Sequence, residues 1–181
     1  MRKQQQGFTL TEILLVVGFI ALASVLVVRL ATNAGVSSTA STEGQNIHAL
    51  AQAVWRGPGM WGFYPYVSNT AMNASNLTPG NMRDASNANR IVNGFGSDIN
   101  VTPATYVAYG ITYPGFNIAT TNIPFNYCPA IVVDEQSDFD QGEISVQGTL
   151  VKTVGGSLDV QALANACESA STVTITFTSF S

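Results

Sequence analysis

One continuous apolar segment dominates the amino-terminal part of the chain. Residues 8–28 form a run of 21 positions with a single ionisable side chain, Glu12, and the run ends at Arg29. A helix of this length spans about 30 Å, the thickness of the hydrocarbon core of a bilayer. The preceding residues, MRKQQQG, contain two basic side chains and no acid. This charge pattern indicates a cytoplasmic amino terminus, so the segment is predicted to be a membrane-spanning helix.

The residues at the start of this segment suggest processing and assembly. In a secretory signal peptide the small residue of the cleavage site follows the apolar core, whereas here Gly7 precedes it. Cleavage after Gly7 would leave the helix in the product and create an α-amino group on Phe8. A carboxylate in a lipid-facing helix is costly unless it is paired, so Glu12 indicates a function. Either Glu12 lies near the wet interface, or it pairs with the Phe8 amine of a neighbouring chain and sets their register.

After this run the pattern turns polar and then regains a helical period. Ile47, Leu50, Ala51 and Val54 are spaced i, i+3, i+4, i+7, which places them on one helix face. We therefore predict a single helix from residue 8 to about residue 55, whose second half packs on a sheet. The sequence Gly57-Pro58-Gly59 ends it.

The rest of the chain shows mainly the two-residue period of strands. Alternation begins near Asp98, and the clearest case is the last segment, where Val173, Ile175 and Phe177 alternate with threonines. Further strands are predicted at residues 106–113, at residues 130–133, and around Ile144, Val146 and Leu150. Short helices are predicted from Thr78-Pro79 to Ala85, and from near Ser157 with Val160, Leu163, Ala164 and Cys167 on one face. The aromatic residues Trp61, Phe63, Tyr64 and Tyr66 are expected to fill a core. A long helix, antiparallel strands and a covering helix predict an α+β fold.

Composition favours a packed domain outside the cell. Charged residues make up 10% of the chain and hydrophobic ones 46%, which does not suit a disordered tail. Two of the seven basic residues lie before position 8, which leaves five basic against eleven acidic side chains. A nucleic-acid-binding surface needs a basic patch, and none is visible, so nucleic acid is not an expected partner.

The two cysteines, Cys128 and Cys167, both follow the predicted membrane segment. They are either buried free thiols or a disulfide, and an oxidising compartment beyond the membrane favours the disulfide. Their separation of 39 positions does not fit a CxxC motif, which argues against zinc binding or redox catalysis by these residues.

Other candidate chemistry is sparse. The chain has one histidine, His48, for which a packing or solvated role is favoured, and no catalytic triad is supported. Acids cluster between residues 134 and 143, where Asp138, Asp140 and Glu143 partly match a calcium-binding loop. The full ligand pattern of such a loop is missing, so a solvated loop is the favoured alternative. The sequence therefore predicts neither an enzyme nor a cofactor.

The motif Gly-Phe-Thr-Leu-Thr-Glu at residues 7–12, with its basic leader and apolar helix, resembles the amino-terminal signature of type IV pilins and pseudopilins. The resemblance implies that a prepilin peptidase cleaves after Gly7 and methylates Phe8, and that Glu12 is the family's assembly glutamate. Asn-Gly-Phe-Gly at residues 93–96, Ile123-Pro124 before Cys128, a second cysteine late in a helix and a threonine-rich last strand resemble type IVb pilins. The short leader and Phe8 depart from that subclass and are similar to type IVa.

The resemblance implies both a domain plan and a function. It divides the chain into a leader (1–7), a transmembrane and filament-core helix (8–29), a helical extension packed on the globular domain (30–56) and an α+β pilin domain (57–181). It implies a subunit that starts in the inner membrane and is then assembled with identical subunits, by the pilus assembly machinery, into an extracellular pilus. Roles in adhesion, aggregation or conjugative contact would follow. The alternatives are a minor pilin or pseudopilin, and a membrane-anchored binding module that never polymerises.

Overall fold

The structure is a computed structural model, and it describes residues 35–59 and 64–180. Contacts divide the chain into two compact units, Met1–Val36 and Ser37–Ser181, and the fold described below is that of the second. In the part of the chain that the structure describes, no helix combines the length and the apolar character needed to cross a membrane. The predicted membrane segment and the leader lie outside the described residues.

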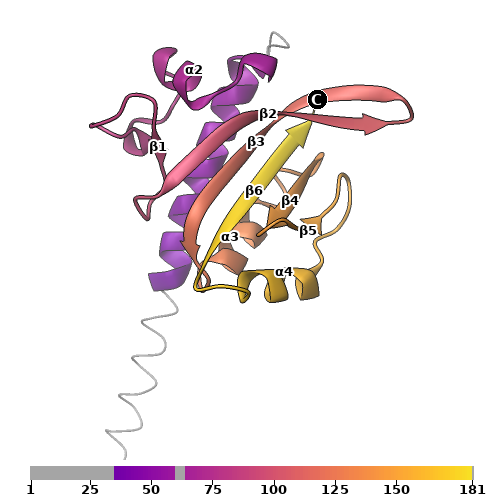
Figure 1. The fold of residues 1–181 in the computed structure, drawn as a ribbon. Helices are drawn as coiled ribbons and strands as arrows, with labels where there is room; N and C mark the ends of the chain where they lie inside the picture. The colour runs from indigo at the N-terminus through magenta and orange to yellow at the C-terminus, as the bar shows by residue number, and fades with distance from the viewer. Residues whose placement is uncertain (1–34, 60–63, 181) are drawn as a thin grey trace, which may run out of the picture. The chain divides into compact units, whose positions relative to one another are not determined.

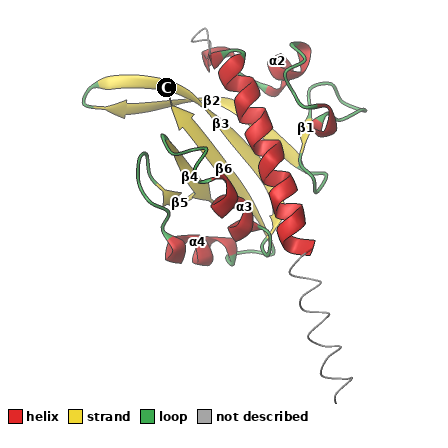
Figure 2. Cartoon of the chain, turned by 180° about the vertical axis from the view of Figure 1, so that it is seen from behind, coloured by secondary structure: helices red, strands yellow, loops and turns green. Residues whose placement is uncertain are grey.

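The first helix covers residues 35–56 and packs along one face of the sheet (Figure 2). Its predicted apolar stripe is confirmed, since Ile47, Leu50, Ala51 and Val54 are fully buried. The helix ends where expected, and the Gly57 amide donates to the Ala53 carbonyl at 3.0 Å in the closing turn.

The sheet has six strands, all paired antiparallel, in the order β1-β2-β3-β6-β4-β5 (Figure 1). Its strands are β1 (Ile91–Val92), β2 (Asp98–Ala108), β3 (Ile111–Pro124), β4 (Gly142–Val146), β5 (Thr149–Lys152) and β6 (Thr172–Phe180). The last strand of the chain therefore lies in the middle of the sheet, with Ile118 and Ile144 both opposite Phe177. The predicted alternation of β6 is confirmed, because Val173, Ile175 and Phe177 are buried.

Two tight hairpins account for differences from the expected strands. The predicted run at residues 106–113 is divided between β2 and β3 by a turn at Tyr109 and Gly110, whose φ angles are +53° and +77°. A second turn at Gln147 and Gly148, with φ of +50° and +76°, joins β4 to β5. Two successive residues with positive φ match the type I′ turn that suits the twist of a hairpin. Leu150 therefore lies on β5 and not in line with Ile144 and Val146.

The strand predicted at residues 130–133 is wrong, because these residues belong to helix α3 (Cys128–Glu135). A four-residue apolar run cannot distinguish a strand from a buried helix turn. The buried positions of α3 are Cys128, Ile131, Val132 and Glu135, which is a helical spacing. Pro129, in the first turn of α3, suits the start of a helix.

The last helix, α4 (Val160–Cys167), starts later than predicted and turns a different face inward. The Asp159 side chain caps it by accepting from the Ala162 amide at 2.9 Å. Its buried residues are Leu163, Ala166 and Cys167, whereas Val160 is 70% exposed. The expected position of Val160 on the inner face is therefore wrong.

Short elements connect the first helix to the sheet. They are the 3₁₀ turn η2 (Tyr64–Tyr66), helix α2 (Asn69–Ala74) and the 3₁₀ turn η3 (Gly80–Met82). The helix predicted from Thr78 is only the single turn η3, and the sequence interpretation missed α2, which Ser68 caps. Within the aromatic cluster, Tyr64 is buried and stacks on Phe116, with ring centroids 6.0 Å apart, so its predicted core role is confirmed. Tyr66 is 74% exposed, and Trp61 and Phe63 lie outside the described residues.

Candidate functional site

The residues predicted to be processed and to drive assembly, Gly7, Phe8 and Glu12, lie outside the described residues. The predicted disulfide is present: Cys128 and Cys167 are bonded, with their Cα atoms 5.8 Å apart and both side chains buried. The bond joins the first residue of α3 to the last residue of α4. It connects α3, which precedes the β4–β5 hairpin in the sequence, to α4, which follows the hairpin.

The Asn-Gly-Phe-Gly segment forms a turn that contacts the first helix. The buried Asn93 side chain accepts from the amides of Phe95 and Ser97 at 3.0 and 2.9 Å. The same side chain donates to the Thr120 hydroxyl at 3.0 Å and the Thr121 carbonyl at 2.8 Å. One amide group therefore satisfies four polar partners and fixes the turn against β3.

Glu43 connects the first helix to this turn. Its carboxylate accepts from the Gly94 amide at 2.7 Å, and the residue is only 1% exposed. Burial raises the pKa of Glu43, although the Gly94 amide and the Asn46 side chain oppose the shift. The contact joins residues 51 positions apart, and it fixes the helix along its axis against the sheet domain.

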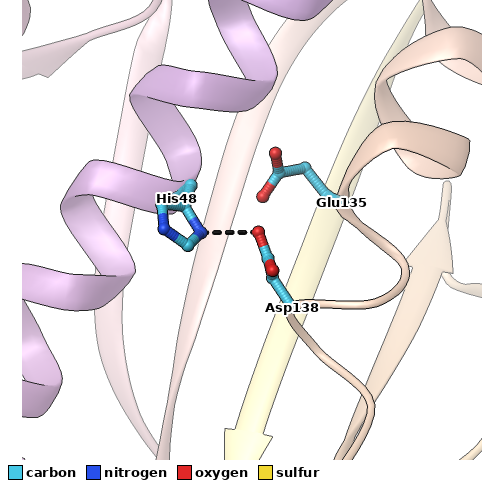
Figure 3. A group of neighbouring side chains, drawn as sticks. All are labelled: His48, Glu135 and Asp138. Carbon is cyan, nitrogen blue, oxygen red and sulfur yellow. Dashed lines mark ion pairs between the residues drawn. The ribbon is translucent and has the colours of Figure 1, made fainter.

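A second polar group lies between the first helix and the end of α3 (Figure 3). His48 comes from the helix, Glu135 is the last residue of α3, and Asp138 follows one turn later. His48 Nδ1 lies 2.5 Å from Asp138 Oδ2, so the predicted packing or solvated role of His48 becomes a specific ion pair. Figure 3 shows the Glu135 carboxylate pointing toward His48 beside this pair.

Glu135 is the buried acid of this group, and its pKa is shifted. It is 3% exposed, and its Oε2 atom has no hydrogen-bond partner within residues 35–59 and 64–180. Burial, followed by the negative charges of Asp138 and Asp134, raises the pKa of Glu135 to about 8. Gly44 makes room for these acids, because a Cβ atom at this position would lie 2.8 Å from both Asp134 Oδ2 and Glu135 Oε1.

The three residues of the calcium hypothesis are not brought together. Asp138 faces His48, whereas the Asp140 carboxylate lies 3.9 Å from Lys152 Nζ on another side of the loop. Glu143 is on β4 opposite Thr178. The buried Lys152 ammonium also donates to the Phe139 and Asp140 carbonyls, both at 3.0 Å, and burial lowers its pKa.

Sequence reasoning missed the grouping of His48 with Glu135. The signal that was available is the i, i+3 spacing of Glu135 and Asp138, which places two acids on one side of a helix end. The strand predicted at residues 130–133 does not place the two acids at a helix end, so it conceals this spacing.

The far end of the β2–β3 hairpin carries exposed apolar side chains. Val107, Tyr109 and Ile111 are 65%, 102% and 56% exposed. Nearer the sheet, Tyr106 contacts Tyr113 and Phe180, with ring centroids 6.3 and 5.2 Å apart. The hairpin therefore offers an aromatic surface to solvent beside the end of β6.

Comparisons with known proteins agree with this architecture. A family model described as PilS N terminal matches residues 37–180. A type IVb pilin from Salmonella typhi is similar in structure, with 19% identity, coverage of 75% of this chain and 96% of that one, and a TM-score of 0.57. TcpA, a type IV pilin from Vibrio cholerae El Tor biotype, has 16% identity, coverage of 78% and 98%, and a TM-score of 0.54. A search of curated protein sequences gave no match. The predicted pilin fold is confirmed by these two structures.

Proposed function

The chain belongs to the PilS N-terminal family, and we propose that it is a structural subunit of an extracellular type IV pilus. The single observation that carries the proposal is the family match over residues 37–180. The resemblance of residues 7–12 to the processing motif of type IV pilins supports it from outside the matched range. We propose identical subunits, prepilin peptidase and the pilus assembly machinery as its partners.

The mechanism begins in the inner membrane. The peptidase cleaves after Gly7, and Phe8 becomes the amino-terminal residue. Residues 8–29 then leave the lipid and pack against the same segment of neighbouring subunits. In that apolar core, Glu12 of one subunit neutralises the Phe8 amine of another, because each charge alone would be costly to bury.

The described domain suits an outer coat for such a filament. Its helix is fixed against the sheet by a fully buried apolar stripe and by the Glu43–Gly94 hydrogen bond. The buried disulfide supports the location of this domain in an oxidising compartment. Adhesion, aggregation or conjugative contact would use side chains that the domain exposes, such as Val107, Tyr109 and Ile111 of the β2–β3 hairpin.

Glu12→Ala separates a filament subunit from a lone membrane anchor. The variant should insert and be cleaved normally, since the loss of a charge makes insertion easier. Assembly should fail, because the incoming amine meets no partner. The measurement compares mature protein in membrane and sheared-filament fractions, with Thr11→Ala as the matched control from the same segment.

We expect mature Glu12→Ala subunit to accumulate in the membrane with few filaments, while Thr11→Ala assembles as the unaltered chain does. Filaments at the unaltered yield from Glu12→Ala would refute the pairing role. If the unaltered chain is only a trace component of sheared filaments, the chain is a minor pilin or pseudopilin. Its complete absence from filaments would indicate an anchored module.

A further inference from the structure

We propose that His48, Glu135 and Asp138 form a binding site for a divalent transition metal ion, for which Zn²⁺ fits best. This site goes beyond the structural role of a pilus subunit. It also differs from the calcium hypothesis, since Asp140 and Glu143 take no part in it. The three residues each offer one ligand atom, and these atoms all lie within 4.8 Å of one another.

The fold brings the ligands together from the first helix, the last residue of α3 and the turn that follows α3. Ser41, Gln45 and His48 are spaced i, i+4, i+7 and share one face of the first helix. This face and the end of α3 enclose a cleft of about 300 Å³. The residues that line the cleft are Ser41, Gln45, His48, Asp134, Glu135 and Asp138. The cleft has room for an ion and for water on its open side.

Among the described residues that line the cleft, acidic side chains outnumber basic ones. Three of its lining residues are acids, and none is a lysine or an arginine. The last turn of α3, which ends here, carries no basic residue to offset the negative end of the helix. His48 balances at most one of the carboxylates. A bound dication would supply the missing positive charge.

The buried Glu135 oxygen points to a ligand more directly. Glu135 is 97% buried, its Oε2 has no hydrogen-bond partner among the described residues, and its carboxylate is aimed at the His48–Asp138 pair (Figure 3). Without an ion, the contact of His48 with Asp138 leaves this oxygen unsatisfied, which is costly in a buried position. Coordination of an ion would satisfy it.

The donor atoms select the class of metal. One imidazole nitrogen with two carboxylate oxygens suits Zn²⁺, which takes three protein ligands and a water in open sites. Calcium requires six to eight oxygen ligands and gains nothing from an imidazole. The His48 and Asp138 side chains are 41% and 35% exposed, so the ion can enter from solvent. Once bound, it would clamp the first helix to the end of α3.

The test is a zinc titration of the untagged full chain in detergent micelles after treatment with EDTA. Isothermal calorimetry should show one saturable Zn²⁺ site and no comparable site for Ca²⁺. We expect Glu135→Gln and His48→Gln each to lower zinc affinity at least tenfold. Asp140→Asn is the matched control, because it removes an acid from the same loop outside the site, and its affinity should stay within twofold.

The position of the ion is tested separately by anomalous scattering from crystals of the same protein soaked in Zn²⁺. We expect a peak at bonding distance from His48 Nδ1 and from both carboxylates. His48 is the sole histidine in the chain, so no other imidazole competes. No saturable zinc binding, an equal loss of affinity in Asp140→Asn, or a peak elsewhere would each overturn the proposal.

Discussion

Reduction of the Cys128–Cys167 disulfide should lower the free energy of unfolding by about 4 kcal/mol. The bond closes a loop between residues 39 positions apart. In the chain-entropy model a loop of this size removes about 13 cal/mol/K from the unfolded ensemble, which is about 4 kcal/mol at 25 °C. The estimate assumes that the folded state stays the same without the bond.

The structure supports that assumption. β4 lies within the closed loop, yet it pairs with β6, which follows the loop in the chain. Leu163 and Ala166 also hold α4 in the core through buried contacts. The sheet and the apolar core therefore keep the loop in place when the bond is broken, and the loss arises mainly from the greater freedom of the unfolded chain.

The assay is urea unfolding of the full chain in detergent micelles, as oxidised protein and as protein refolded under reductant. For a urea dependence of about 2 kcal/mol/M, the midpoint should fall by about 2 M. The double variant Cys128→Ala, Cys167→Ala is the control, because its midpoint should not respond to reductant.

Two results would refute this reasoning. Equal midpoints for the oxidised and reduced protein would show that the cross-link does not restrict the unfolded chain. Fast hydrogen exchange at β4 in the reduced folded protein, with β2 and β3 still protected, would show that the bond holds native structure directly.

Two further substitutions test the contacts that hold the first helix and the turn at residues 93–96. Glu43→Gln should reduce the loss of stability on raising the pH. Burial raises the pKa of Glu43 above its usual 4.5. The contribution of Glu43 to the free energy of unfolding is therefore fully present below that value and is lost as the pH rises through the raised pKa. Urea unfolding of both proteins between pH 4 and 8 measures this difference, and parallel pH profiles would contradict it. Asn93→Ala should lower the free energy of unfolding by about 2–4 kcal/mol, because the change leaves buried partners of its amide unpaired. Asn87→Ala, at an exposed turn, is the control in the same urea assay, and an equal loss in both would refute a special role for Asn93.

The sequence alone determined the elements whose period is long or regular. The stripe from Ile47 to Val54 is buried as its helical spacing predicted, and Val173, Ile175 and Phe177 are buried as their alternation predicted. The disulfide followed from an argument about the compartment, and the α+β class followed from the order of these elements. For the helix stripe and the last strand the signal lay in neighbouring residues that share one face, so no distant contact was needed to recognise it.

Only the tertiary structure decided the short and the distant features. Four apolar residues at 130–133 fit either period, and they become helical because α3 buries Cys128, Ile131, Val132 and Glu135 together. The place of β6 between β3 and β4 is set by pairing across the chain and not by the pattern of β6 itself. His48 meets Glu135 and Asp138 because the first helix lies beside the end of α3 and the turn after it, which brings together residues that are distant in the sequence. The local period of the hydrophobic residues shows which face of a helix or strand is apolar. Which element packs against that face depends on how the apolar faces of all the elements are buried together.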